Sequence, residues 1–134
     1  MTLAIAIIVF FGIIGVGVFV LLVIQQRKKH LTEGEMAFVR NQWRMIGMGR
    51  NPKNDILEAD KLLDYVLTKY GYQGSLGEKL KAARSLFSDI DGVWVAHKLR
   101  NQIAHEMNFT PPQSEVDLAL KSFKKALQDL KIKL

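Results

Sequence analysis

Residues 97–106, HKLRNQIAHE, bring together side chains that can handle protons and phosphates. A histidine titrates near neutral pH, so it can take or give a proton during a reaction. An arginine can stabilise the negative charge that develops on a phosphate. We therefore treat His97, Arg100, Asn101 and His105 as candidates for acid–base chemistry on a phosphate ester, or for binding one.

A helical projection at about 100° per residue separates this region into two faces. The apolar face is expected in the core and consists of Gly92, Val95, Ala96, Leu99, Ile103 and Met107. Trp94, His97, Asn101 and His105 fall on the opposite face, with Arg100 at the border. Exposure to solvent alone does not favour such a composition. We expect this helix to be buried on both sides, by its own core and by a second subunit or a ligand.

Metal and cofactor chemistry fit the sequence less well. The chain has no cysteine and three histidines, and the separation of His97 from His105 is not a ligand spacing. Residues 89–92 lack the remaining ligands of a calcium loop. The Gly47-Met48-Gly49 stretch follows no predicted strand, so it is not a phosphate-binding fingerprint. We expect no metal and no cofactor.

The elements that must position these residues are all predicted to be helices. Their expected ranges are 33–47, 54–70, 76–87, 92–107 and 114–131. The start signals are capping-box spacings at Thr32/Glu35, Ser75/Glu78 and Ser114/Asp117, together with Asn54 and Asp91. The clearest apolar stripe is Val116, Ala119, Leu120, Phe123, Leu127 and Leu130. Short connections favour antiparallel neighbours, so the fold class is all-α, an up-and-down bundle of four to five helices over residues 33–134.

An apolar segment precedes the bundle. No charged residue lies between Leu3 and Ile24, and a helix of this length spans roughly the 30 Å of a hydrocarbon core. A secretory signal would have a basic start and a shorter apolar run. Residues 1–26 are therefore predicted to be an uncleaved transmembrane anchor, and residues 27–32 a basic linker.

The orientation follows from Arg27, Lys28 and Lys29, which come directly after the apolar segment. The positive-inside rule places this side of the span, and the bundle with it, in the cytoplasm. The formal net charge of +6 belongs to the bundle and linker. Lipid head groups and nucleic acid are the natural partners of a basic domain near a bilayer.

Arg100-Asn101-Gln102-Ile103-Ala104-His105 resembles the R-x4-6-H motif of the HEPN superfamily, the higher eukaryote and prokaryote nucleotide-binding domains. In that family a polar residue often follows the arginine, as Asn101 does here. The resemblance covers residues 33–131 and implies a helical bundle. It also implies a metal-independent endoribonuclease in which Arg100 and His105 are catalytic and Asn101 supports them. Other members of the family bind RNA or nucleotides without cutting.

Several alternatives remain open from the sequence. In one helix, five residues turn Arg100 and His105 about 140° apart, which favours a site composed across a homodimer through the helix 92–107. Asp60 is expected to pair with Arg100, because both flank the apolar stripe of their helix. His97 could assist catalysis or line the dimer interface, and Trp94 could stack a base or pack in the dimer. An antitoxin-like protein partner and a purely structural role are also possible.

Overall fold

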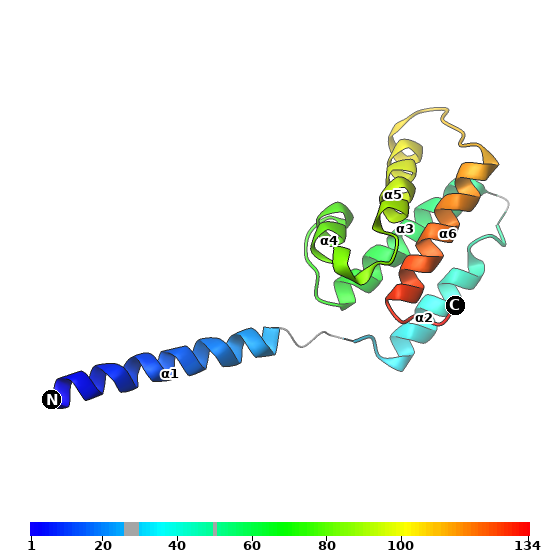
Figure 1. Ribbon diagram of the computed structural model, residues 1–134. Coiled ribbons are helices and arrows are strands. Elements are labelled where there is room, and N and C mark those ends of the chain that lie inside the picture. The colour runs from blue at the N-terminus through cyan, green and yellow to red at the C-terminus, as the bar shows by residue number, and fades with distance from the viewer. Residues whose placement is uncertain (26–29, 50) are drawn as a thin grey trace.

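The computed structural model describes residues 1–25, 30–49 and 51–134, and within these ranges every regular element is helical. A separate apolar helix, α1 (Thr2–Gln25), precedes a helical bundle, as predicted (Figure 1). The elements of the bundle are α2 (Glu33–Met45), α3 (Pro52–Lys69), α4 (Leu76–Ala82), the short 3-10 helix η1 (Arg84–Leu86), α5 (Ile90–His105) and α6 (Gln113–Asp129).

Helix α1 is long and apolar enough to cross a membrane. It has 24 residues, and none of the stretch Thr2–Val20 is buried inside the protein. Arg27, Lys28 and Lys29 lie outside the described residues, so the cytoplasmic orientation stays a prediction. Leu31, which we placed in the linker, is buried in the core of the bundle.

Two of the predicted helix starts are confirmed. The Thr32 side chain accepts a hydrogen bond from the Glu35 backbone, and the Glu35 carboxylate accepts one from the Thr32 backbone. Ser75 and Glu78 form the same reciprocal box at the start of α4. Each box satisfies backbone N–H groups that have no partner within the helix.

The other three start signals are wrong by a few residues. Asn51, not Asn54, caps α3, because Pro52 sets the helical backbone angle in the first turn. Asp89, not Asp91, caps α5, where it accepts a hydrogen bond from the Gly92 backbone. Helix α6 begins at Gln113, directly after Pro112, and has no side-chain cap, so the predicted Ser114/Asp117 box does not form.

Helix α3 is the centre of the bundle and contacts α2, α4, α5 and α6 (Figure 1). Its buried apolar residues include Ile56, Ala59, Leu63, Val66 and Leu67. Helix α2 is held on α3 by an ion pair of 2.8 Å between Glu35 and Lys69. The hydrogen bond from Lys69 lowers the pKa of Glu35, and the same contact raises the pKa of Lys69.

The core face of α5 differs from the prediction. Val93, Ala96 and Leu99 are buried, whereas Val95 is 67% exposed. Met107 is 91% exposed, because α5 ends at His105 and Met107 lies in the following turn. The helix is therefore rotated about its axis relative to the face that apolar content alone suggests.

The buried α6 stripe generates a stability prediction. Phe123 is fully buried, so Phe123→Ala should lower the free energy of unfolding of the bundle by about 3–5 kcal/mol through lost burial and a cavity. The measurement is denaturant unfolding of the full chain in detergent micelles, followed by the fluorescence of Trp43 and Trp94. Leu118→Ala is the control on the same helix. Leu118 is 64% exposed, so its loss should change stability by less than about 0.5 kcal/mol. Equal effects of both substitutions would contradict the assigned core face.

Candidate functional site

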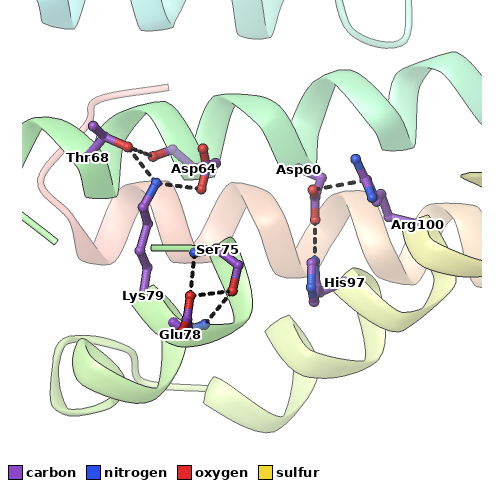
Figure 2. Close-up of polar contacts among 8 residues, drawn as sticks. All are labelled: Asp60, Asp64, Thr68, Ser75, Glu78, Lys79, His97 and Arg100. Atoms are coloured by element: carbon purple, nitrogen blue, oxygen red, sulfur yellow. Dashed lines mark hydrogen bonds and ion pairs between the residues drawn. The ribbon is translucent and has the colours of Figure 1, made fainter. Parts of the chain in front are cut away.

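A buried carboxylate, Asp60 on α3, organises the polar contacts between α3 and α5 (Figure 2). Its Oδ1 lies 2.7 Å from Nδ1 of His97, and its Oδ2 lies 3.2 Å from Nε of Arg100. His97 and Arg100 are three residues apart on α5, so both reach the same side of the helix. The predicted contact between Asp60 and Arg100 is confirmed, and His97 is an additional partner.

Asn101 closes these contacts into a ring. Arg100 NH1 donates to Asn101 Oδ1 at 3.0 Å, and Asn101 Nδ2 lies 3.5 Å from His97 Nε2. An arginine can only donate, so the Asn101 oxygen faces Arg100 and its amide nitrogen faces His97. Nε2 of His97 must then accept, and its Nδ1 must donate to Asp60. The donors and acceptors of the four side chains are mutually consistent only in this tautomer of His97.

The guanidinium of Arg100 is only partly used by this ring. Its buried Nε is within ion-pair distance of Asp60, but the N–H is not aligned for a hydrogen bond. Within the described part of the chain, its one hydrogen bond to a side chain is the one to Asn101. A guanidinium has five N–H donors, and the Arg100 side chain is 29% exposed. Donors therefore remain for an anionic ligand.

The ring lines an open pocket of about 500 Å³ between α3, α5 and the start of α4. The wall opposite α5 contains Lys61 and Asp64 of α3, and residues 74–77 lie at its edge. Figure 2 shows how α4 is fixed there: Lys79 Nζ lies 2.8 Å from Asp64 Oδ1 and 2.6 Å from Thr68 Oγ1. Beside it, the hydrogen bond from the Ser75 backbone lowers the pKa of Glu78. The pocket is thus bordered by α3, α5 and the capped start of α4.

His105 is not part of this pocket. It lies on the last turn of α5, where it is exposed, and it does not line the hollow that holds Arg100. One chain brings together Asp60, His97, Arg100 and Asn101, but it does not bring His105 to them.

The face of α5 that we expected to meet a second subunit is largely covered by the same chain. Trp94 packs against Gly77 of α4 and lies edge-on to His97, with ring centroids 6.0 Å apart. His97 is 13% exposed in its contact with Asp60. Trp94, His97 and Asn101 are half-buried by their own chain, and His105 is exposed. A homodimer through residues 92–107 stays a prediction.

Sequence reasoning missed two contacts of this region. The His97–Asp60 hydrogen bond could have been predicted from the sequence, because His97 and Arg100 share a side of α5 and Asp60 was already expected to face Arg100. No pattern in the sequence predicts that Lys79 is buried against Asp64, because this contact depends on where α4 lies relative to α3. Among the residues that the structure describes, no group of three or more His, Asp or Glu side chains could hold a metal ion.

Comparison of the chain with protein-family models, with curated proteins and with solved structures finds no match.

Because Asp60 is the shared partner of His97 and Arg100, its substitution should lower the stability of the bundle. Asp60→Ala removes the acceptor of the His97 imidazole and the ion-pair partner of Arg100, and it should lower the free energy of unfolding by about 1–3 kcal/mol. Asp60→Asn should cost less, because its amide oxygen can still accept from His97. The exposed Asp117 is the control, and Asp117→Ala should change stability by less than about 0.5 kcal/mol. A neutral effect of Asp60→Ala would show that the ring does not support the fold.

The tautomer of His97 is a second, independent readout of the same ring. At a pH where the imidazole is neutral, long-range ¹⁵N–¹H correlation spectra should show the proton on Nδ1. In Asp60→Ala this preference should weaken, because the acceptor is gone. A proton on Nε2 in the wild type would contradict the assigned donor and acceptor pattern.

Proposed function

We propose that this protein is a membrane-anchored, metal-independent endoribonuclease of the HEPN type, acting as a homodimer on cytoplasmic RNA. One observation carries the proposal. Asp60 and Asn101 hold the Arg100 guanidinium at an open pocket, and His105 is exposed farther along the same helix. An oriented cation and an accessible imidazole supply charge stabilisation and proton transfer, which together can catalyse cleavage of a phosphodiester.

The reaction needs no water and no metal in its first step. The ribose 2′-oxygen attacks the neighbouring phosphorus, and the bond from phosphorus to the 5′-oxygen of the next nucleotide breaks. His105 takes the proton from the 2′-hydroxyl, and the imidazolium so formed gives it to the leaving 5′-oxygen, so the proton balance of the step is closed. Arg100 stabilises the added negative charge on the phosphate oxygens. The products carry a 2′,3′-cyclic phosphate or, after hydrolysis, a 3′-phosphate.

Asp60, His97 and Asn101 are positioning residues in this scheme. The ring fixes the plane of the Arg100 guanidinium. The free N–H donors of Arg100 are therefore already oriented towards the pocket before a substrate binds. His97 uses Nδ1 on Asp60 and Nε2 towards Asn101, which leaves it without a free nitrogen for substrate. The acid–base role therefore falls to His105.

A second copy of the chain is needed to unite Arg100 with His105. In a two-fold dimer each His105 would be placed at the pocket of its mate, giving two equivalent sites. The anchor would favour this association, because confinement to a membrane raises the local concentration of chains.

The activity is tested with the full chain in lipid vesicles and labelled single-stranded RNA in the presence of a chelator. Wild type should cleave, and Arg100→Ala and His105→Ala should each abolish cleavage while circular dichroism stays unchanged. Asn101→Ala should weaken activity less. Arg84→Ala and His30→Ala are the controls, because both residues are exposed and lie outside α5. An equally active His105→Ala protein would remove the mechanism.

The composite site has its own test. Arg100→Ala and His105→Ala chains, each inactive alone, are mixed in detergent and reconstituted together. Random pairing makes half of the dimers mixed, and each mixed dimer holds one intact site, so about a quarter of wild-type activity should return. No recovery, with both proteins folded and present, would show that Arg100 and His105 do not act across two chains.

A non-catalytic RNA-, nucleotide- or protein-binding module is the second candidate. The observation that favours it is that Asp60 already balances the charge of Arg100, which weakens the pull on a substrate phosphate. Salt-dependent RNA binding by a wild type that never cuts would establish this module in place of the nuclease.

The cytoplasmic orientation is tested in the same cysteine-free chain. A cysteine at Ser114, an exposed position at the start of α6, should resist a membrane-impermeant maleimide in intact cells and react after lysis. The reason is that the basic residues 27–29 should retain this side of the span in the cytoplasm. Labelling in intact cells would reverse the orientation and exclude a role on cytoplasmic RNA.

A further inference from the structure

Helix α2 and the turn that follows it expose three large apolar side chains, Phe38, Met45 and Met48. Their exposed fractions are 46%, 66% and 74%. Phe38 and Met45 are seven residues apart, about two helical turns, so they lie on the same face of α2. Gly47 has a φ of +83°, which turns the chain sharply after the helix and presents Met48 at the tip. We call these three residues the α2 apolar edge.

The charge around this edge is positive. Residues 36–49 contain Arg40 and Arg44 and no acidic residue. Arg44 is exposed and Arg40 is half-buried. On the facing side of α3, Asp55 is buried, and Glu58 forms an ion pair of 2.8 Å with Lys61. The acidic groups near the edge are thus buried or paired, while Arg44 is exposed.

Helix α2 packs on the bundle through residues next to the edge and through Phe38 itself. The Phe38 ring packs on Tyr65 of α3 with centroids 5.3 Å apart, and Trp43 packs against the core. Phe38, Met45 and Ile46 line one side of a hollow of about 270 Å³ between α2 and α3. Exposed apolar side chains gathered on one edge are typical of a surface that contacts another molecule or a membrane.

The position of α2 in the chain limits what that contact can be. Helix α1 ends at Gln25 and α2 begins at Glu33, so residues 26–32 separate them. Seven residues span at most about 25 Å when extended, and a helix of 13 residues is about 20 Å long. If α1 spans the membrane, every residue of α2 therefore stays within about 45 Å of the lipid surface.

We propose that the α2 apolar edge docks on the anionic surface of the membrane that α1 spans. Met45 and Met48 enter the interfacial region, and Arg44 contacts lipid phosphates, with Arg40 beside it. Exposed apolar side chains flanked by arginines have the composition of segments that lie in a membrane interface. Each basic residue near an anionic surface strengthens such binding by about fivefold. This surface rests on the proposed membrane anchor and is independent of the proposed nuclease activity.

The experiment uses the full chain with a single cysteine carrying an environment-sensitive NBD label, reconstituted in vesicles of phosphatidylcholine and phosphatidylglycerol. Met48→Cys probes the edge. Met107→Cys is the matched control, because it is also an exposed methionine but lies after α5. The label at position 48 should be quenched several-fold more than the label at 107 by lipids brominated on their acyl chains. Adding Arg44→Glu, or omitting phosphatidylglycerol, should reduce the difference.

The outcomes separate the surface from the anchor. A chain that does not float with the vesicles overturns the anchor, and the docking surface with it. A chain that floats but shows equal quenching at positions 48 and 107 overturns the surface alone. A label at position 48 that is shifted to the blue yet not quenched by brominated lipid is covered by protein, for example a second copy, and also overturns the proposal.

Discussion

The burial of one carboxylate, Asp60, constrains how α5 packs on α3. An unpaired charge in a protein interior costs several kcal/mol, so a carboxylate at this position requires donors from a neighbouring element. Helix α5 supplies them from His97 and Arg100. To do so it must turn the side that carries both residues towards α3. The rotation leaves Val95 in solvent, although its apolar character alone would place it in the core.

The same rotation decides the chemistry that one chain can present. It places Arg100 and Asn101 at the pocket between α3, α4 and α5, where their contacts orient them. It also directs His105, on the last turn of α5, away from that pocket. The pairing with Asp60 orients the guanidinium, and the five-residue spacing on one helix separates it from the exposed imidazole. Catalysis by Arg100 and His105 would consequently require a second copy of the chain, whereas binding of a ligand at the Arg100 pocket would not.

The membrane would affect dimerisation in two ways, through the anchor α1 and through the α2 apolar edge. An anchor at α1 concentrates chains in two dimensions, which favours the weak association that a composite site needs. Contact of the α2 apolar edge with lipid would also restrict rotation of the bundle about its tether. Two copies restricted in this way meet with fewer relative orientations, so less entropy is lost when they pair.

Local patterns in the sequence determined most of the fold. The apolar length of α1, the capping boxes at Thr32 and Ser75, and the stripes of α3 and α6 all depend on residues close together in the chain. The Asp60–Arg100 contact was also predictable, because a charge at the margin of an apolar stripe needs an opposite charge facing it. Three helix starts were misplaced by a few residues. At α3 and α5 a second capping residue lay near the true start, and α6 begins after Pro112 with no side-chain cap.

The tertiary structure alone decided which side chains meet the residues of the candidate site. The sequence placed Trp94, His97, Asn101 and His105 on one face, but it could not show that α3 and α4 cover the first two. That outcome depends on the rotation of α5 and on the docking of α4 through Lys79 and Asp64, which are contacts between elements distant in the chain. Helical periodicity determines which residues share a face, and only the packing of whole helices determines what that face touches.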